Sequence, residues 1–178
     1  MERMIRKIAL AAAACILSGF MPSAYCLDGI SVEAGRGNDR TNVLRVGAQW
    51  RWRKERPVDE RWRLVGYWEA SAGAWESDDD SSADFAVTPV FRFERRGRQR
   101  VPYIEAAIGF HILSRHISRE RQFSTNFQFG DHIAAGLRFG PRARYDVGVR
   151  LQHLSNGGIR HPNPGINFVL LRFQYHLD

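Results

Sequence analysis

The sequence is poor in cysteine and has no long apolar run after its N-terminal segment, and each absence excludes some classes of fold. Its two cysteines are Cys15 and Cys26, both in an N-terminal segment that we expect to be removed. The remaining chain would then have neither a disulfide nor a reactive thiol. No second apolar run approaches the roughly 20 residues of a membrane-spanning helix, and no long 3.6-residue pattern indicates amphipathic helices.

The N-terminal segment has the layout of a secretory signal peptide. Three cations precede an apolar run over residues 8–20, and small residues follow it up to Cys26. Because the run is too short to span a membrane, it favours an exported chain over a membrane anchor. Tyr25 is too large for the position before a lipoprotein cysteine. We therefore predict a signal peptide over residues 1–26 and a single domain over residues 27–178.

The charge balance narrows the choice of partners. Loss of the leader lowers the formal net charge from +7 to about +5. The remaining positive charge indicates an anionic partner such as a phosphorylated lipid or nucleic acid. The plainer alternative is that the charge only keeps the protein soluble. No glycine-rich phosphate loop joins a strand to a helix, so nucleotide chemistry is unsupported. The histidines lack metal-ligand spacing, so we expect neither a metal nor another cofactor.

Period-2 alternation of apolar and polar residues dominates the mature chain. It recurs in eight segments separated by turn-forming or charged clusters, namely residues 30–34, 44–52, 62–72, 85–93, 104–112, 127–139, 145–155 and 169–177. The apolar face of each segment is continuous, whereas the polar face carries charges and glycines. The pattern predicts an all-β fold of eight antiparallel strands.

Two barrels fit this pattern, and they differ in which face points outward. A soluble lipid-binding barrel turns its apolar face inward, whereas an outer-membrane barrel turns it to lipid and fills its lumen with polar side chains. The export signal, strands near the roughly 9–11 residues that span a bilayer, and aromatics near strand ends favour the eight-stranded transmembrane barrel. We expect it in the outer membrane of a Gram-negative cell.

An even-stranded barrel has both termini on the periplasmic side. The outer loops are then expected near residues 36–41, 76–84, 114–125 and 156–166, and the periplasmic turns near residues 55–61, 95–101 and 140–142. The acidic run Glu76-Ser-Asp-Asp-Asp-Ser-Ser could bind a divalent cation, but a solvated charge run is the favoured interpretation.

A pair of reactive residue types ends the seventh segment. His153 and Ser155 are two residues apart, so on a strand they share a face, and a histidine beside a serine can take its hydroxyl proton. Continuing the alternation puts both residues, together with Asn167 of the last segment, on the lipid-facing surface at the extracellular rim. The plain alternative is a set of polar groups at the headgroup boundary, where they are normal.

The residues of this region resemble a known family. His153-Leu-Ser-Asn-Gly-Gly, the Pro162-Asn-Pro-Gly loop and the final strand look like those of the lipid A 3-O-deacylases of the PagL type. The resemblance implies an outer-membrane barrel that hydrolyses the ester-linked 3-hydroxyacyl chain at position 3 of lipid A. It also implies a serine–histidine site on the outer barrel surface.

Carried over by position, the resemblance makes Ser155 the nucleophile and His153 the general base. Asn156 and the backbone N–H of Gly158 become candidates for holding the oxyanion. The phosphates of lipid A would be drawn to a basic barrel, with contacts at two further rim residues, Arg160 and His161.

One position departs from the family pattern. The family has a glutamate where this chain has Asn167, whose carbonyl can still accept the histidine N–H and fix its tautomer. The alternative orienting group is Asp131. A tight turn at residues 140–142 would place Asp131 opposite Leu151 and diagonal to His153, about 7–8 Å away. Of the two groups, Asn167 is the preferred orienter.

Rival interpretations remain beside the deacylase. One is a non-catalytic barrel used for adhesion or membrane structure, and the other is the soluble lipid-binding barrel. The expected partners are lipopolysaccharide and the membrane itself, with a homodimer left open and no nucleic acid.

Overall fold

The computed structural model describes residues 26–77, 80–97, 99–114 and 123–177. Its strands are β1 (Gly29–Gly37), β2 (Asn42–Arg51), β3 (Arg56–Pro57), β4 (Trp62–Ser77), β5 (Asp80–Arg95), β6 (Arg100–Leu113), β7 (Phe127–Phe139), β8 (Tyr145–Ser155) and β9 (Ile166–His176). Two short 3-10 helices, η1 (Asn38–Arg40) and η2 (Pro141–Ala143), lie in connections. Among these residues no helix is long and apolar enough to cross a membrane. The predicted signal peptide lies outside the described residues, apart from Cys26.

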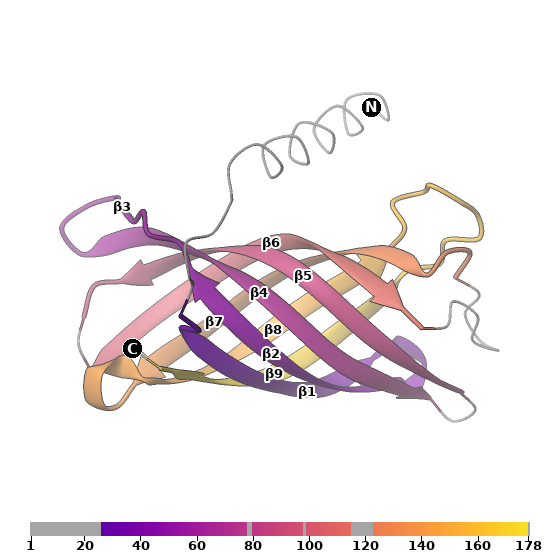
Figure 1. Cartoon of the computed structure of the whole chain (residues 1–178), viewed down its shortest axis with the longest axis horizontal. Helices are drawn as coiled ribbons and strands as arrows, with labels where there is room; N and C mark the ends of the chain where they lie inside the picture. The colour runs from indigo at the N-terminus through magenta and orange to yellow at the C-terminus, as the bar shows by residue number, and fades with distance from the viewer. Residues whose placement is uncertain (1–25, 78–79, 98, 115–122, 178) are drawn as a thin grey trace.

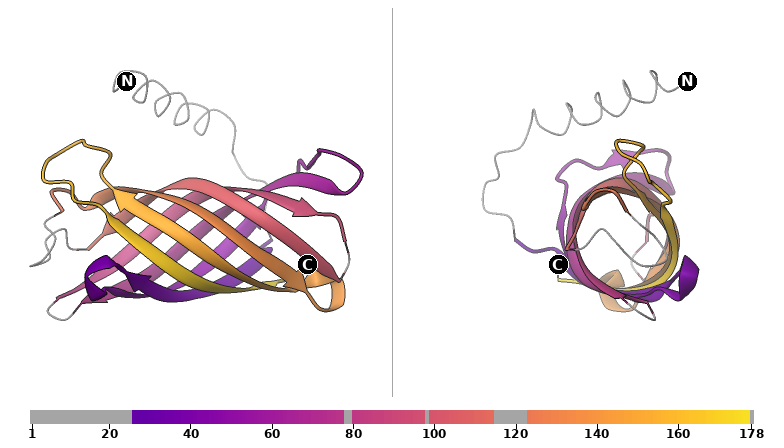
Figure 2. Two further views of the ribbon diagram at one scale, coloured as in Figure 1. Left: turned by 180° about the vertical axis from the view of Figure 1, so that it is seen from behind. Right: turned by 90° about the vertical axis from the view of Figure 1, so that its right-hand side faces the viewer.

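Eight of the strands close into a barrel. Each is antiparallel to its neighbours in the order β2-β1-β9-β8-β7-β6-β5-β4, and the β2–β4 pairing closes the ring. The ring is seen end-on in the right panel of Figure 2. The remaining strand, β3, has only two residues and pairs with the start of β4. The expected eight-stranded antiparallel barrel is thus confirmed.

The faces of the strands point as the membrane barrel requires. Apolar side chains cover the outer surface, where Ile108 is 64% exposed and Leu171 61% exposed. The intervening charged residues point into the lumen, where Arg45, Arg92 and Glu105 are buried. Because a soluble barrel needs the opposite orientation, the soluble alternative is contradicted.

Ion pairs fill the lumen. Arg92 binds Glu105 and Asp146, each at 2.8 Å, and Arg172 binds Glu69 as well as Glu105. Towards the outer end, further pairs follow: Arg45 with Glu33 and Asp84, and Arg150 with Glu69. Charges buried this deeply are tolerated because each is paired and hydrogen-bonded.

Two expected connections differ from the structure. Residues 76–84 do not form a long outer loop, since β4 continues to Ser77, β5 starts at Asp80, and Glu76 pairs with Ser81. Strands that project beyond the bilayer can carry polar residues, because water satisfies both faces there. Asp84, at the end of the expected loop, is buried against Arg45 and His111. No group of three or more acids, histidines or cysteines in the described residues is arranged to hold a metal ion.

The connection between β7 and β8 is longer than the tight turn that we expected. The last pair of the ladder is Phe139 with Tyr145, so residues 140–144 form the turn, with Arg142 and Ala143 at positive φ in η2. The ladder register is therefore shifted by two residues. As a consequence, the structure places Asp131 directly opposite His153, and the expected diagonal position is wrong.

Candidate functional site

The candidate site lies at the outer end of β8 and β9. Ser155 is the last residue of β8, and the loop 156–165 leads from it into β9. Figure 1 shows this loop, in ochre, at the end of the barrel away from the C-terminus. His153 and Ser155 are half-buried, Asn167 is exposed, and all three share the outward face with Leu151 and Val169.

His153 is held by a hydrogen bond across the β8–β9 ladder. It is directly opposite Asn167, and its Nδ1 lies 2.7 Å from Asn167 Oδ1. Because an amide oxygen can only accept, Nδ1 carries the proton in this pair. A neutral imidazole then leaves Nε2 unprotonated, as a general base requires.

Asp131 lies opposite His153 on the other neighbouring strand, β7. Its side chain is exposed on the outer face. Among the described residues no hydrogen bond joins Asp131 to His153, whereas Asn167 makes one. The geometry thus favours Asn167 over Asp131 as the group that orients the imidazole, and the role itself stays a prediction.

Ser155 sits beside an aromatic surface. Its partner across the ladder is Phe129, whose ring contacts those of Phe127 and Phe110 at centroid distances of 5.0 and 6.0 Å. In the described part of the chain no hydrogen bond joins Ser155 to His153. Such bonds are often long without substrate and tighten in the complex. The aromatic surface offers apolar area beside the hydroxyl.

Asn156 ties the loop to the barrel. It is fully buried, and its amide Nδ2 donates to Ser124 Oγ at 2.9 Å and to the Arg160 carbonyl at 2.7 Å. Its Oδ1 accepts from the Gly158 N–H at 2.9 Å, and its own N–H donates to Asn163 Oδ1. Both expected oxyanion donors are therefore engaged, within the loop or with Ser124, and their oxyanion role stays a prediction.

Arg160 and His161 are exposed at the tip of the same loop. The Arg160 carbonyl is fixed by Asn156 and by the Ser124 hydroxyl, which donates to it at 2.8 Å. The backbone of the loop tip is thus anchored while the guanidinium remains exposed. Sequence reasoning did not find Ser124, because it is 32 residues from its partner Asn156.

Gly165 closes the loop against the imidazole. Its φ is +63°, and a Cβ at this position would lie 2.7 Å from His153 Cε1 and 3.2 Å from Nε2. Only glycine therefore fits, both for its backbone and for the close approach to His153. The Pro164-Gly165 pair signals a turn in the sequence, but the sequence does not say which group the glycine faces.

An apolar cluster fills the lumen under the site. Leu154 and Ile166, which flank the site residues along their strands, are buried with Phe168 and Leu170. The cluster extends to Val43, Trp75, Leu113 and Phe123. Each such buried side chain contributes about 2 kcal/mol, so the ends of β8 and β9 are held on a packed base. A rigid base keeps His153 and Asn167 in register.

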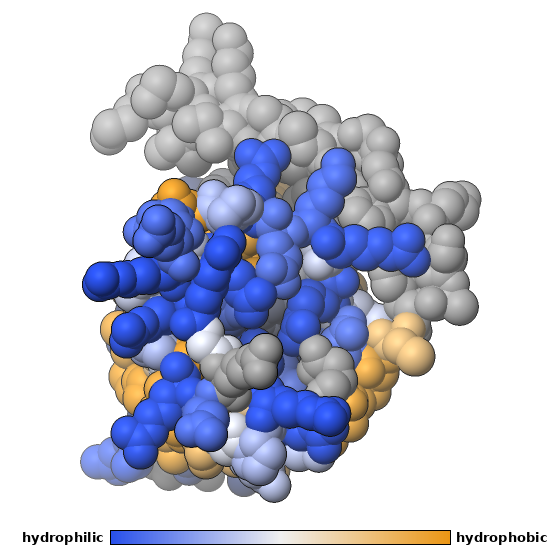
Figure 3. Space-filling model, turned by 90° about the vertical axis from the view of Figure 1, so that its left-hand side faces the viewer, coloured by the Kyte–Doolittle hydropathy of each residue, from blue (hydrophilic) through white to orange (hydrophobic). Residues whose placement is uncertain are grey.

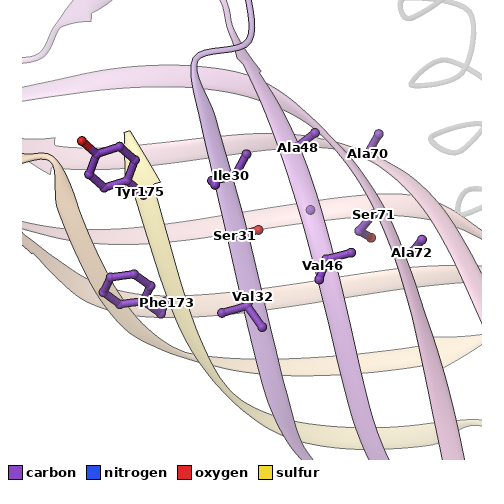
Figure 4. A pocket seen from close by; sticks show the side chains of 11 residues that line it. Ile30, Ser31, Val32, Val46, Ala48, Ala70, Ser71, Ala72, Phe173 and Tyr175 are labelled. Carbon is purple, nitrogen blue, oxygen red and sulfur yellow. The ribbon is translucent and has the colours of Figure 1, made fainter. Parts of the chain in front are cut away.

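A separate apolar groove lies on the outer face nearer the periplasmic end. It has a volume of about 690 Å³ and is lined by Ile30, Ser31, Val32, Val46, Gly47, Ala48, Ala70, Ser71, Ala72, Phe173 and Tyr175. Figure 4 shows how short the side chains of β2 and β4 are there. Its lining holds no histidine or carboxylate beside its serines, so it does not compete with the site at Ser155.

The sequence is similar to that of known proteins. A family model described as "Lipid A 3-O-deacylase (PagL)" matches residues 42–176. The lipid A deacylase PagL of Pseudomonas aeruginosa is 33% identical over 96% of this chain and 98% of its own length. That of Bordetella bronchiseptica is 36% identical over 60% of each chain.

Solved structures are also similar to this chain. The crystal structure of the outer membrane enzyme PagL superposes with a TM-score of 0.77 at 33% identity, covering 83% of this chain and 98% of that one. A designed transmembrane β-barrel has a TM-score of 0.52 at 16% identity, covers 88% of this chain and all of that one, and supports the fold alone. The chain belongs to the lipid A 3-O-deacylase (PagL) family of outer-membrane barrels.

Proposed function

We propose that this barrel removes the ester-linked 3-hydroxyacyl chain at position 3 of lipid A, with Ser155 as nucleophile and His153 as general base. The observation that carries the mechanism is the outward-facing His153, whose Nδ1 is held at 2.7 Å from Asn167 Oδ1. Lipid A lies in the outer leaflet, so a site on the lipid-facing rim can reach its ester without extracting the lipid.

The proposed chemistry follows the logic of serine hydrolases. Ser155 Oγ attacks the acyl carbonyl carbon while its proton passes to His153 Nε2. The tetrahedral intermediate collapses, the bond to the sugar oxygen breaks, and Nε2 returns the proton to that oxygen. Water then attacks the acyl-enzyme with Nε2 as base, which releases the 3-hydroxy fatty acid and restores the hydroxyl.

The surroundings support this substrate. The aromatic surface of Phe129, Phe127 and Phe110 beside Ser155 suits the departing acyl chain. Arg160 and His161, exposed on the loop, are the proposed contacts to the lipid A phosphates. For Asn156 and Gly158 to bind the oxyanion, an N–H must leave its partner in the loop, as the Gly158 N–H would leave Asn156 Oδ1.

Mass spectrometry of lipid A tests the proposal. Lipid A is incubated with the refolded protein in detergent, beside Ser155→Ala and His153→Ala. We expect the native chain to remove one 3-hydroxyacyl mass and both variants to be inactive, because the attacking oxygen or its base is missing. If Ser155→Ala keeps full activity, the nucleophile is another group. Unchanged lipid A with the folded native chain would favour the non-catalytic barrel.

The proposal also includes an oligomeric state. A homodimer packed through the groove between β1, β2 and β4 is the arrangement to test, since its short side chains leave room for those of a second copy. Cysteines placed at Ala48 or Ala70 should cross-link two copies in the membrane. Their failure to cross-link, with cysteines elsewhere on the outer face as control, would indicate a monomer or another interface.

A further inference from the structure

Cations collect at the end of the barrel opposite the candidate site. Six exposed residues form what we call the basic rim: Arg53, Lys54, Arg56, Arg95, Arg96 and Arg100. They lie in two adjoining connections or at the ends of the strands beside them. The two connections meet, since the Arg96 N–H donates to the Arg61 carbonyl and Arg95 is opposite Trp62. Figure 3 views the barrel from this end and shows hydrophilic side chains over most of it. Both described chain ends lie here, so this is the periplasmic end.

The ladder register turns part of the rim towards lipid. Residues directly opposite in a ladder share a face. Arg95 is opposite Trp62, and Arg100 is opposite Phe139, and both aromatic residues belong to the outward sets of their strands. Trp62 also stacks on Phe93 with ring centroids 4.8 Å apart. An aromatic belt followed by arginines is the order of groups expected across a bilayer interface.

Few carboxylates balance these cations. The connection between β2 and β4 also carries Glu55, Asp59 and Glu60. Glu55 binds Arg63 at 2.8 Å, and Asp59 accepts the backbone N–H groups of residues 61 and 62. In the part of the chain that the structure describes, no ion pair joins a rim side chain to a carboxylate. The six cations of the rim also outnumber the three carboxylates of this connection, so the rim keeps a net positive charge.

We infer that the basic rim binds anionic phospholipid headgroups of the periplasmic leaflet, of the phosphatidylglycerol type. Guanidinium groups donate paired hydrogen bonds to a phosphate, while the neighbouring tryptophans pack on the glycerol and upper acyl region. This contact holds the far end of the barrel in the inner leaflet and so sets the depth of Ser155 in the outer leaflet. The inference does not depend on the proposed catalytic roles.

The tryptophans provide a reporter for this site. Trp50, Trp52, Trp62 and Trp68 belong to the outward sets of β2, the segment after it and β4, at the periplasmic end. Trp75 is buried at the other end, where its Nε1 donates to Asp84. Acyl chains brominated near the headgroup quench tryptophans that they touch. The quenching therefore measures which lipid lies against this end.

The experiment reconstitutes the protein in phosphatidylcholine vesicles in which either phosphatidylglycerol or phosphatidylcholine is brominated. We expect brominated phosphatidylglycerol to quench more at equal mole fraction. The preference should fall as salt rises, because screening weakens exposed charges. Arg95→Gln with Arg100→Gln should lower the preference roughly twenty-five-fold, at about fivefold for each cation removed.

A matched pair at the outer end controls for net charge. Arg36 and Arg40 are exposed at the outer end, and Arg36→Gln with Arg40→Gln removes the same charge. This pair should keep the preference. If Arg95→Gln with Arg100→Gln does not fold, Arg53→Gln with Lys54→Gln tests the rim outside the strands. No preference in the native chain, or an equal loss in the control pair, would overturn the inference.

Discussion

Two residues flank His153 across the ladders, and they differ in what they offer the imidazole. Asn167, on β9, accepts a hydrogen bond from Nδ1 at 2.7 Å. Asp131 lies on the same outer face but on the other neighbouring strand, β7. An amide oxygen fixes the tautomer, but a carboxylate would also stabilise the imidazolium that forms during attack. Under the proposed mechanism, an asparagine at position 167 should therefore affect the rate rather than the geometry.

We predict that Asn167→Ala lowers kcat at least tenfold, because the imidazole loses its orienting acceptor. Asn167→Glu should raise kcat about fivefold, since a charge-assisted hydrogen bond is stronger by about 1 kcal/mol. The measurement is the initial rate of acyl release. Asp131→Ala is the comparison and should stay within about twofold. A loss with Asp131→Ala equal to that of Asn167→Ala would transfer the role to Asp131.

Gly165→Ala should lower kcat at least tenfold with a smaller change in KM. Its Cβ would lie 2.7 Å from His153 Cε1, so the imidazole or the loop must shift, and either shift disturbs the hydrogen bond to Asn167. Gly140→Ala is the matched control, with φ +78° and a Cβ 2.7 Å from the Tyr145 ring at the far end of the barrel. Both changes also cost about 1–3 kcal/mol of backbone strain, because an alanine is held at positive φ. Equal activity of the two folded variants would refute a positioning role for Gly165.

At the scale of elements, the loop 156–165 depends on a contact with the segment before β7. Ser124 accepts from Asn156 Nδ2 and donates to the Arg160 carbonyl. Without the hydroxyl, both groups lose a partner near the membrane surface. The loop carries Gly165, so its displacement would reach His153.

We predict that Ser124→Ala lowers kcat/KM roughly fivefold, which corresponds to about 1 kcal/mol for a lost hydrogen bond. Limited proteolysis should also cut the loop faster. Ser114→Ala removes a hydroxyl that accepts the Ala83 N–H in another outer connection and should leave the rate unchanged. The same loss of kcat/KM in both serine variants would mean that removing either hydroxyl destabilises the whole outer end of the barrel.

Element boundaries show where sequence reasoning failed. The acidic run beginning at Glu76 resembles a loop in composition, yet β4 and β5 continue through most of it as paired strands. Charge excludes a residue from a lipid-facing strand but not from one that projects into water. The extra strand β3 was missed because two residues carry no period.

At the scale of the molecule, the buried ion pairs of the lumen depend on one another. Glu105 accepts from Arg92, Arg172 and the Tyr67 hydroxyl. Removing it leaves buried guanidinium groups without their partner. The site on the outer surface does not contact these groups directly.

Glu105→Ala should lower the free energy of unfolding by about 3–5 kcal/mol, as expected for a broken buried ion pair. Urea unfolding of the barrel in vesicles measures it. Glu76→Ala, at an exposed carboxylate of the β4–β5 hairpin, should change it by less than about 0.5 kcal/mol. If Glu105→Ala is equally mild, water enters the lumen and solvates the arginines.

The sequence by itself determined the barrel, the direction of its faces and the outward position of His153, Ser155 and Asn167. These follow from the two-residue period of a strand, which is a local property of the backbone. Only the tertiary structure decided the register of Asp131, the burial of Asn156 against Ser124 and the approach of Gly165 to His153. The register depends on the length of the turn at residues 140–144, which the two-residue period does not predict. The loop contacts join residues that are distant in the chain, and a local pattern does not predict those either.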